Sequence, residues 1–213
     1  MLEALAFCWL LAEGAVCSVM RHRVLICGHS MVFWTARQAR RSHFGSQLGL
    51  SDKAIIEWRG KRALRWHRLL HLLFGESQCL PPHVLVIHLG GNDLGFVKDK
   101  ALVLQAIHNM RLIRERCPFI TLIWSAMLPH QVWKCGCDPH ILNRARRWVN
   151  NKIHNAMNGG LGFYLAHDDI MLLRPELYRA DGIHPSEVGN QIFLRDLQAG
   201  VAACLASLVG DRD

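Results

Sequence analysis

Short apolar runs alternate along this chain with longer stretches in which apolar positions recur every three or four residues. An uncharged run of about four to eight residues is typical of a strand buried on both faces, whereas the longer period is typical of an amphipathic helix. The predicted strands cover residues 23–27, 54–58, 84–89, 119–127 and 160–166. The predicted helices cover residues 31–41, 61–74, 100–116, 140–157 and 185–205.

This alternation predicts the class of fold. A repeating order of strand, helix and strand favours a parallel sheet with helices on both faces, which is an α/β fold. The chain has 213 residues, of which 51% are hydrophobic and 20% charged, so it can bury one substantial core. We therefore expect a single domain over residues 21–213, preceded by an apolar extension over residues 1–20.

The extension is similar to the apolar part of a secretory signal, but Glu3 stands where a positive charge is usual and Glu13 interrupts the apolar run. We interpret it as an amphipathic helix packed on the domain or as the remnant of an upstream region, with a signal peptide as the alternative. The run is too short and too interrupted to predict a transmembrane segment.

The cysteines and the charge suggest a compartment and a class of partner. The eight cysteines show no framework spacing, and several lie in apolar runs typical of buried thiols. We therefore expect a reducing, cytoplasmic location, with secretion as the alternative. Lys and Arg number 25 against 17 Asp and Glu, a formal charge of +8, so an anionic partner could bind through the basic helices.

Small or polar residues follow three of the predicted strands. Ser30 follows the first strand through Gly28, Gly60 follows the second, and Asn92 follows the third through two glycines. The carboxyl ends of parallel strands share one edge of a sheet, where α/β proteins bind their ligands. A serine there can act as a nucleophile, and an amide there can stabilise a developing negative charge. Helix capping and ordinary turns are the structural alternatives.

Asp181 and His184 add the partners that a serine nucleophile needs. They are three residues apart in a turn before Pro185, which suits the first turn of the last predicted helix. At that spacing a carboxylate can orient an imidazole. One fold could therefore bring a nucleophile, a base and a carboxylate together.

A second group of residues could be interpreted as a metal site. It comprises His130, Cys135, Cys137 and His140. The two cysteines are separated by one residue, whereas structural zinc sites usually separate them by two or more. We therefore favour a loop with incidental thiols and expect no metal.

These blocks resemble the SGNH hydrolases, also called the GDSL esterase and lipase family, over roughly residues 23–205. Four short motifs carry the resemblance, in this order: GHS with Ser30, WRGKRAL with Gly60, GGND with Asn92, and DGIHPSEVG with Asp181 and His184. The blocks are also similar to those of SGNH-type domains carried by some vertebrate retroelements.

The resemblance implies both a fold and a mechanism. The fold would be a three-layer α/β/α sandwich around a five-stranded, parallel, flavodoxin-like sheet. Ser30 would be the nucleophile, His184 its base, and Asp181 the residue that orients His184. The backbone amides of Ser30 and Gly60 and the side-chain amide of Asn92 would form the oxyanion hole, and no cofactor would be required.

One position departs from the family pattern. The family usually has Asp where this chain has His29, between Gly28 and Ser30. That aspartate is not a proton-transfer residue, so the triad could remain intact, although a histidine there could change the pH profile.

The sequence therefore predicts a serine esterase that hydrolyses a carboxylic or acetyl ester of a small or lipid-like substrate through an acyl-enzyme. The alternative is a binding module of the same fold that has lost turnover and holds anionic lipid or nucleic acid on its basic helices. His29 and the positive charge motivate this alternative.

Overall fold

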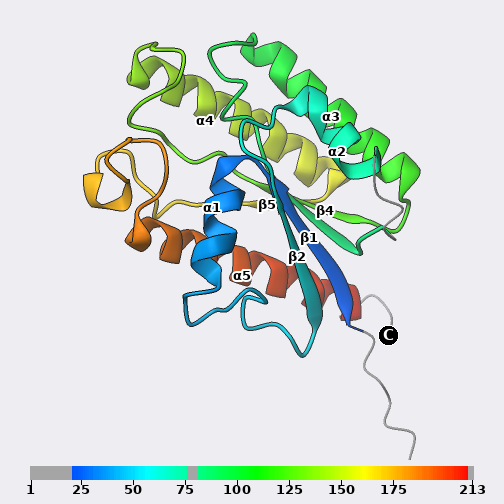
Figure 1. Cartoon of the computed structure of the whole chain (residues 1–213). Helices are drawn as coiled ribbons and strands as arrows, with labels where there is room; N and C mark the ends of the chain where they lie inside the picture. Colours follow the sequence, from blue (N-terminus) through cyan, green and yellow to red (C-terminus); the bar gives the residue numbers. More distant parts are fainter. Residues whose placement is uncertain (1–20, 76–80, 211–213) are drawn as a thin grey trace, which may run out of the picture.

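The computed structural model describes residues 21–75 and 81–210, and within these ranges five strands form one sheet (Figure 1). The spatial order is β2-β1-β3-β4-β5, and every neighbouring pair is parallel. The strands are β1 (His22–Gly28), β2 (Ala54–Gly60), β3 (Val84–His88), β4 (Thr121–Ser125) and β5 (Phe163–Leu165). The predicted parallel sheet is confirmed.

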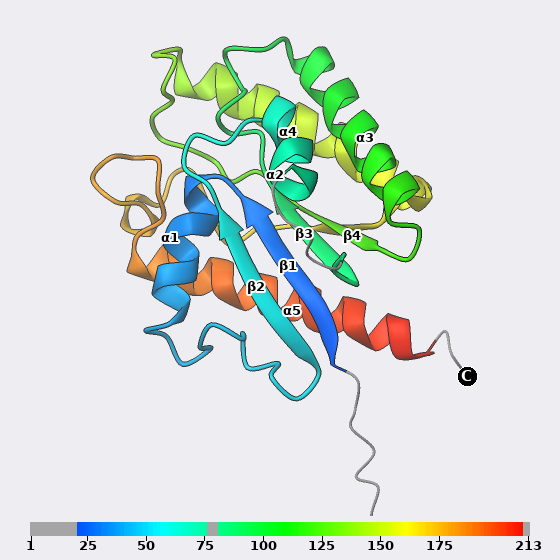
Figure 2. The ribbon, with the colours of Figure 1, turned by 45° about the vertical axis from the view of Figure 1, so that its right-hand side comes forward.

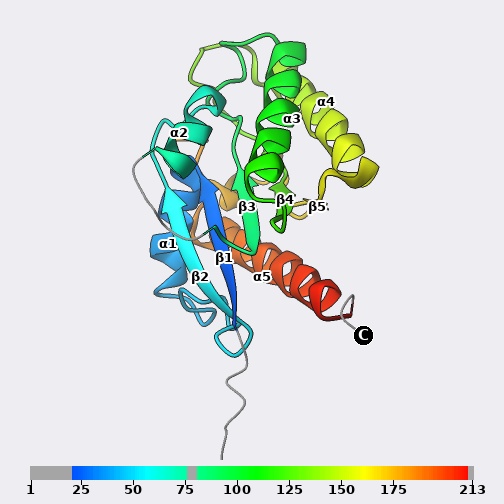
Figure 3. The ribbon, with the colours of Figure 1, turned by 90° about the vertical axis from the view of Figure 1, so that its right-hand side faces the viewer.

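Helices cover both faces of this sheet, with α1 and α5 on one face and α2, α3 and α4 on the other (Figure 3). Their bounds are α1 (Ser30–Ala39), α2 (Leu69–Phe74), α3 (Asp99–Arg116), α4 (Pro139–Ala156) and α5 (Glu187–Gly210). Three short helical turns join them: η1 (Trp66–Arg68), η2 (Met157–Leu161) and η3 (Pro175–Leu177). This three-layer α/β/α arrangement is the predicted fold class.

Each face of the sheet has its own hydrophobic core, because successive side chains of a strand point to opposite faces. In β1, Val24 and Ile26 belong to the core beneath α1 and α5. Leu25 and Cys27 belong to the core beneath α3 and α4. Burial on both faces explains why β1 has no charged residue between Val24 and Gly28.

The chain order creates a crevice at one end of the sheet. After β1 the chain moves outward to β2, and β3 then pairs with the opposite edge of β1 (Figure 2). The connections that follow β1 and β3 therefore diverge, and ligands of α/β folds bind where they diverge. Ser30 and Asn92 lie in these two connections.

The helix predicted over residues 61–74 is wrong over its first five residues. Residues 61–65 form a loop, η1 begins at Trp66, and α2 begins only at Leu69. Ala63 adopts a left-handed conformation with φ of 58°, which a helix excludes. Leu64 in this loop and Trp66 at the start of η1 are both buried, so the apolar positions here reflect contacts with the core and not one continuous helix.

The predicted extension over residues 1–20 lies outside the described residues.

No helix in the part of the chain that the structure describes is long and apolar enough to cross a membrane.

Candidate active site

Ser30 is placed by the tight connection between β1 and α1. β1 ends at Gly28, and Ser30 is already the first residue of α1. A Cβ atom at Gly28 would lie 2.2 Å from the carbonyl oxygen of His88, so only glycine fits this turn. The turn fixes Ser30 at the carboxyl end of β1, at the N-terminus of α1.

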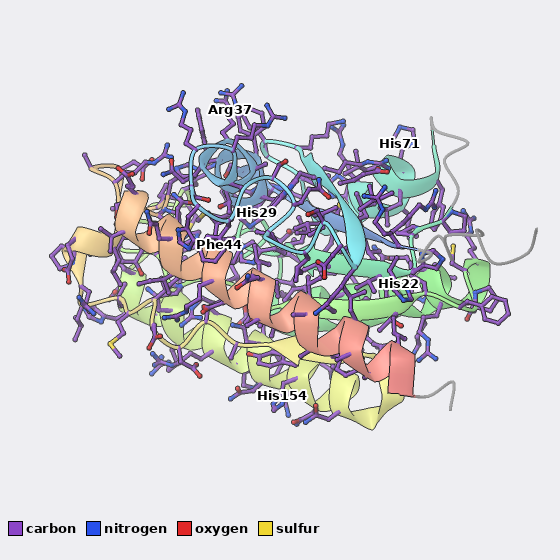
Figure 4. The ribbon with its side chains drawn as sticks, turned by 90° about the horizontal axis from the view of Figure 1, so that it is seen from below. His22, His29, Arg37, Phe44, His71 and His154 are labelled. Atoms are coloured by element: carbon purple, nitrogen blue, oxygen red, sulfur yellow. The ribbon has the colours of Figure 1, made fainter. Side chains whose placement is uncertain are left out.

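His29 caps the helix that carries Ser30. Its Nδ1 atom accepts a hydrogen bond from the backbone amide of Met31 at 3.3 Å. Burial, together with smaller contributions from the nearby charges of His184 and Lys134, lowers the pKa of His29 to about 3. His29 is therefore a neutral cap at physiological pH. Because the cap takes the Met31 amide, the Ser30 amide stays among the uncapped donors of the helix N-terminus. In Figure 4, Arg37 projects outward from α1, whereas His29 lies within the outline of the molecule.

Ser30, His184 and Asp181 form a continuous chain of hydrogen bonds. The Ser30 Oγ and His184 Nε2 atoms are 2.9 Å apart, and His184 Nδ1 is 2.7 Å from Asp181 Oδ2. The other Asp181 oxygen, Oδ1, accepts the backbone amides of Ile183 and His184, each at 2.9 Å. With Asp181 accepting from Nδ1–H, the His184 Nε2 atom is free to accept the hydroxyl proton of Ser30.

The charge of Asp181 is stabilised within this chain. Burial raises its pKa, but the hydrogen bonds from the His184 ring and from the amides of His184 and Ile183 outweigh burial, so the pKa is lowered overall. A carboxylate that stays ionised can hold the imidazole in one orientation.

The turn that carries Asp181 and His184 is tied to the loop after β4. The carbonyl oxygen of Gly182 accepts the backbone amides of Gln131 and Val132, at 2.8 and 3.2 Å. Gly182 has φ of 63°, and a Cβ atom there would lie 2.9 Å from a methyl carbon of Val132. Glycine therefore allows both the turn and the close approach of the two loops.

A buried side-chain bridge links this turn to the helix of the nucleophile. Thr35 of α1 donates its hydroxyl to Asn190 Oδ1 at 2.8 Å. Asn190 in turn donates Nδ2 to the carbonyl oxygens of Pro185 and Ser186, at 2.9 and 2.8 Å. The bridge thus runs from α1 to the residue that follows His184. Sequence reasoning missed it, because neither residue type stands out in an amphipathic helix.

Asn92 is nearly buried and held at both ends of its amide. Its Nδ2 donates to the carbonyl oxygen of Leu64 at 3.1 Å, and its Oδ1 accepts from Lys134 Nζ at 3.3 Å. An amide nitrogen carries two protons, so one N–H remains after the bond to Leu64.

Gly60, the third predicted oxyanion donor, lies in the sheet and not in the lining of the Ser30 cavity. Gly60 is the last residue of β2, and a Cβ atom there would lie 2.3 Å from the backbone nitrogen of Phe33. Its small size therefore lets α1 pack closely on β2.

An open cavity of about 650 Å³ surrounds the hydroxyl of Ser30. Its walls come from loops that are far apart in the sequence, and the lining residues are Ser30, Trp34, Arg62, Ala63, Lys134, Arg179, Asp181 and His184. The three predicted triad residues thus share one cavity. Asn92 and Gly60 are not among the lining residues, but Asn92 is hydrogen-bonded to Lys134, which is.

The possible metal cluster is dispersed. The ring of His130 is buried against Trp133, with ring centroids 4.2 Å apart, while Cys135 lies against Gly95. Among the described residues, no three His, Cys, Asp or Glu side chains are grouped so that they could hold a metal ion.

Comparisons with known proteins match the structure of this chain but not its sequence. No protein-family profile and no curated protein sequence matches. A candidate acylhydrolase of Bacteroides fragilis is 18% identical with a TM-score of 0.68, covering 86% of this chain and 88% of its own. A GDSL-like lipase of Bacteroides thetaiotaomicron is 18% identical with a TM-score of 0.66, covering 88% and 89%. An acetyl esterase variant solved with acetate is 13% identical with a TM-score of 0.68, covering 88% and 99%.

At these low identities the likeness concerns the fold. The TM-scores of 0.66 to 0.68 extend over 86–88% of this chain and 88–99% of the other three. The chain therefore has the α/β/α fold of the GDSL-like lipase and the acetyl esterase, which is the SGNH hydrolase fold.

Proposed function

We propose that this protein is a serine esterase of the SGNH hydrolase family, with Ser30, His184 and Asp181 as its catalytic triad. The observation that carries the proposal is the hydrogen-bond chain from Ser30 Oγ through the His184 ring to Asp181, at 2.9 and 2.7 Å. The triad also lies at the carboxyl ends of the strands, where α/β proteins bind their ligands, and this position supports a catalytic role.

The proposed reaction has two halves. His184 Nε2 takes the proton of the Ser30 hydroxyl while Oγ attacks the carbonyl carbon of the ester. The tetrahedral intermediate collapses, the alcohol leaves with the proton from His184, and the acyl group stays on Ser30. His184 then takes a proton from a water molecule that attacks the acyl carbon, and it returns this proton to Ser30 Oγ as the acid leaves. Asp181 holds the imidazole in position throughout.

The oxyanion of each intermediate needs donors that are already oriented. The backbone amide of Ser30 is one, because it is uncapped at the N-terminus of α1. The remaining N–H of Asn92 is a second. The predicted donor role of Gly60 stays a prediction.

Ala63 is a further candidate for the oxyanion hole. It lines the same cavity as Ser30, and its φ of 58° is unusual for a residue with a side chain. Within the described ranges its backbone amide donates to no acceptor. A strained loop with a free amide beside a nucleophile supports a third donor at Ala63.

Hydrolysis of para-nitrophenyl acetate tests the proposal. We expect turnover by the wild type and a loss of at least about 1000-fold in Ser30→Ala. Ser51→Ala is the matched control, because Ser51 is exposed and lies outside the triad. Equal rates in the wild type and Ser30→Ala would refute the proposed nucleophile.

The binding module without turnover remains the second candidate. It rests on His29 and on the positive charge of the chain, whereas the hydrogen bond between Ser30 and His184 favours the esterase. A fluorophosphonate probe separates the two, since only an activated serine reacts rapidly. Rapid labelling that Ser30→Ala abolishes would support the esterase, whereas no labelling would support the binding module.

The resemblance to SGNH-type domains of vertebrate retroelements stays a prediction.

We also propose that the protein works in a reducing compartment. Among the described residues, Cys27, Cys117, Cys135, Cys137 and Cys204 are free thiols. Burial raises the pKa of Cys27 to about 12, and it raises the pKa of Cys204 to about 11, so both behave as inert core residues. Mass spectrometry after alkylation, with and without prior reduction, should give the same number of modified thiols.

A further inference from the structure

We infer that the cavity selects esters that carry an oxyanionic group, a carboxylate or a phosphate, beside the ester bond. This inference names a substrate class and rests on the proposed function. Its basis is the convergence of Arg62, Lys134 and Arg179 on the cavity that holds Ser30.

The three cations reach the cavity from different parts of the chain. Arg62 lies in the loop after β2, Lys134 in the loop after β4, and Arg179 in the loop before α5. All three are exposed. A general basic surface would place arginines along helices, as α1 does with Arg37, which Figure 4 shows pointing outward. Convergence of three loops on one cavity is instead a property of the site.

Arg179 is held in place by its neighbours. Its guanidinium carbon lies over the ring of Trp34, 4.9 Å from the ring centroid, and its Nε donates to the carbonyl oxygen of Pro185 at 3.1 Å. These contacts use one face and one N–H of the guanidinium, so the two terminal amino groups remain as a fork of donors. Such a fork matches the two oxygens of a carboxylate or a phosphate.

Lys134 brings a charge next to the proposed oxyanion hole. Its Nζ donates to Asn92 Oδ1 at 3.3 Å, and an ammonium group has two further donors. A substrate anion near Lys134 would therefore lie close to the ester carbonyl that Asn92 is proposed to bind.

Arg62 has neither a hydrogen bond nor an ion pair with any acceptor in the described part of the chain. It adjoins Ala63, whose amide is the proposed third oxyanion donor. Its guanidinium is thus the charge in this cavity that lacks a partner.

The cavity has little negative charge to balance these cations. Asp181 is the acidic side chain among the lining residues, and it already accepts from His184 and two backbone amides. Three cations face one engaged carboxylate, so the walls attract anions. A concave site lined by one sign of charge concentrates ligands of the opposite sign.

The test compares two esters of the same shape, para-acetoxybenzoate and its neutral isostere para-acetoxybenzamide. The readout is the ratio of their kcat/KM values, which cancels differences in enzyme quality. We expect Arg62→Gln to lower this ratio about five-fold and Arg62→Lys to restore most of it. The control is Arg111→Gln, which removes the same charge from the exposed face of α3. The wild-type ratio should also fall in about 1 M salt, where charges are screened within about 3 Å. A phosphate in place of the carboxylate, as in para-acetoxyphenyl phosphate, shows which oxyanion the cavity prefers.

Calorimetry on Ser30→Ala separates this inference from the proposed activity. The variant should bind para-acetoxybenzoate more tightly than the benzamide, and adding Arg62→Gln should remove most of the difference. Selective binding without any hydrolysis by the wild type would refute the esterase and retain the anion site. Equal binding of the two esters, or equal effects of Arg62→Gln and Arg111→Gln on the ratio, would overturn the anion site even in an active esterase.

Discussion

Acid should destabilise this protein because histidines are buried beneath the nucleophile. His29, His88, His130 and His167 are each no more than 7% exposed. The rings of His29 and His88 lie 5.2 Å apart, and Ser125 Oγ joins His88 Nδ1 to His167 Nε2, at 3.0 and 2.8 Å. The bonds of Ser125 thus connect β4 with His88 of β3 and with His167 in the loop after β5.

Burial keeps these rings neutral. Burial is the largest cause that lowers the pKa of His29 to about 3 and the pKa values of His88 and His130 well below the ordinary value. Repulsion between a protonated ring and its neighbours, which include Lys134 and Arg146, contributes the rest. Burial also lowers the pKa of His167, although Asp196, which is 3.0 Å from its Nδ1, opposes part of the change.

The sign of the pH effect follows from linkage. An unfolded histidine has a pKa of about 6.5, so below that pH the unfolded chain binds protons that the folded chain does not. The stability contributed by a neutral buried histidine is complete above about pH 6.5 and is lost as the pH falls towards its folded pKa. Each such residue changes the free energy of unfolding by about 1.4 kcal/mol per pH unit. For His29, His88 and His130 together this is about 4 kcal/mol per unit below about pH 6, against a typical total of about 5–15 kcal/mol.

Urea unfolding between about pH 7 and about pH 5, followed by tryptophan fluorescence, measures this slope. His29→Asn removes one buried imidazole but keeps a side chain that caps helices well, so the slope below about pH 6 should fall by about 1.4 kcal/mol per pH unit. His140→Asn removes an exposed histidine and should leave the slope unchanged. A free energy of unfolding that is flat over this range, or an equal slope in His29→Asn and the wild type, would refute the reasoning.

Three further substitutions test individual contacts. Asn92→Ala removes a proposed oxyanion donor and should lower kcat for para-nitrophenyl acetate about 100-fold or more; an unchanged kcat would remove Asn92 from the mechanism. Thr35→Val leaves Asn190 Oδ1 without its buried donor and should lower the free energy of unfolding in urea by about 1–3 kcal/mol, whereas Thr35→Ser, which keeps the hydroxyl, should lose less. Ala63→Gly relieves a left-handed conformation, so the melting temperature should rise by about 2 °C; a fall would show that the unfolded-state entropy of glycine outweighs the relief.

Local patterns predicted much of the fold because they report local physics. Val84–His88 is buried throughout, as its uncharged run predicted. Gly28 and Ser30 lie at the strand-to-helix turn that their order predicted, and Asp181 lies 2.7 Å from His184, as a spacing of three residues allows. In each case the interacting groups are within a few residues of one another.

Non-local packing explains where sequence reasoning failed. Leu69, Leu70 and Leu73 follow a helical spacing that we extended back to Leu64, yet Leu64 lies in a loop and is buried in the core from there. Gly60 also has a packing role that the sequence does not show, because a Cβ atom there would meet the backbone of Phe33. Contacts between segments that are distant in the chain produce no hydrophobic periodicity from which they could be predicted.

The sequence by itself determined the order of strands and helices, the turn at Ser30 and the pairing of Asp181 with His184. Only the tertiary structure decided that Ser30 meets His184, that Ala63 joins their cavity, and that Arg62, Lys134 and Arg179 surround it. The physical reason is range: hydrophobic periodicity and turn chemistry act over a few residues. The cavity is instead set by how two helical layers pack on a parallel sheet and so position loops that are distant in the chain.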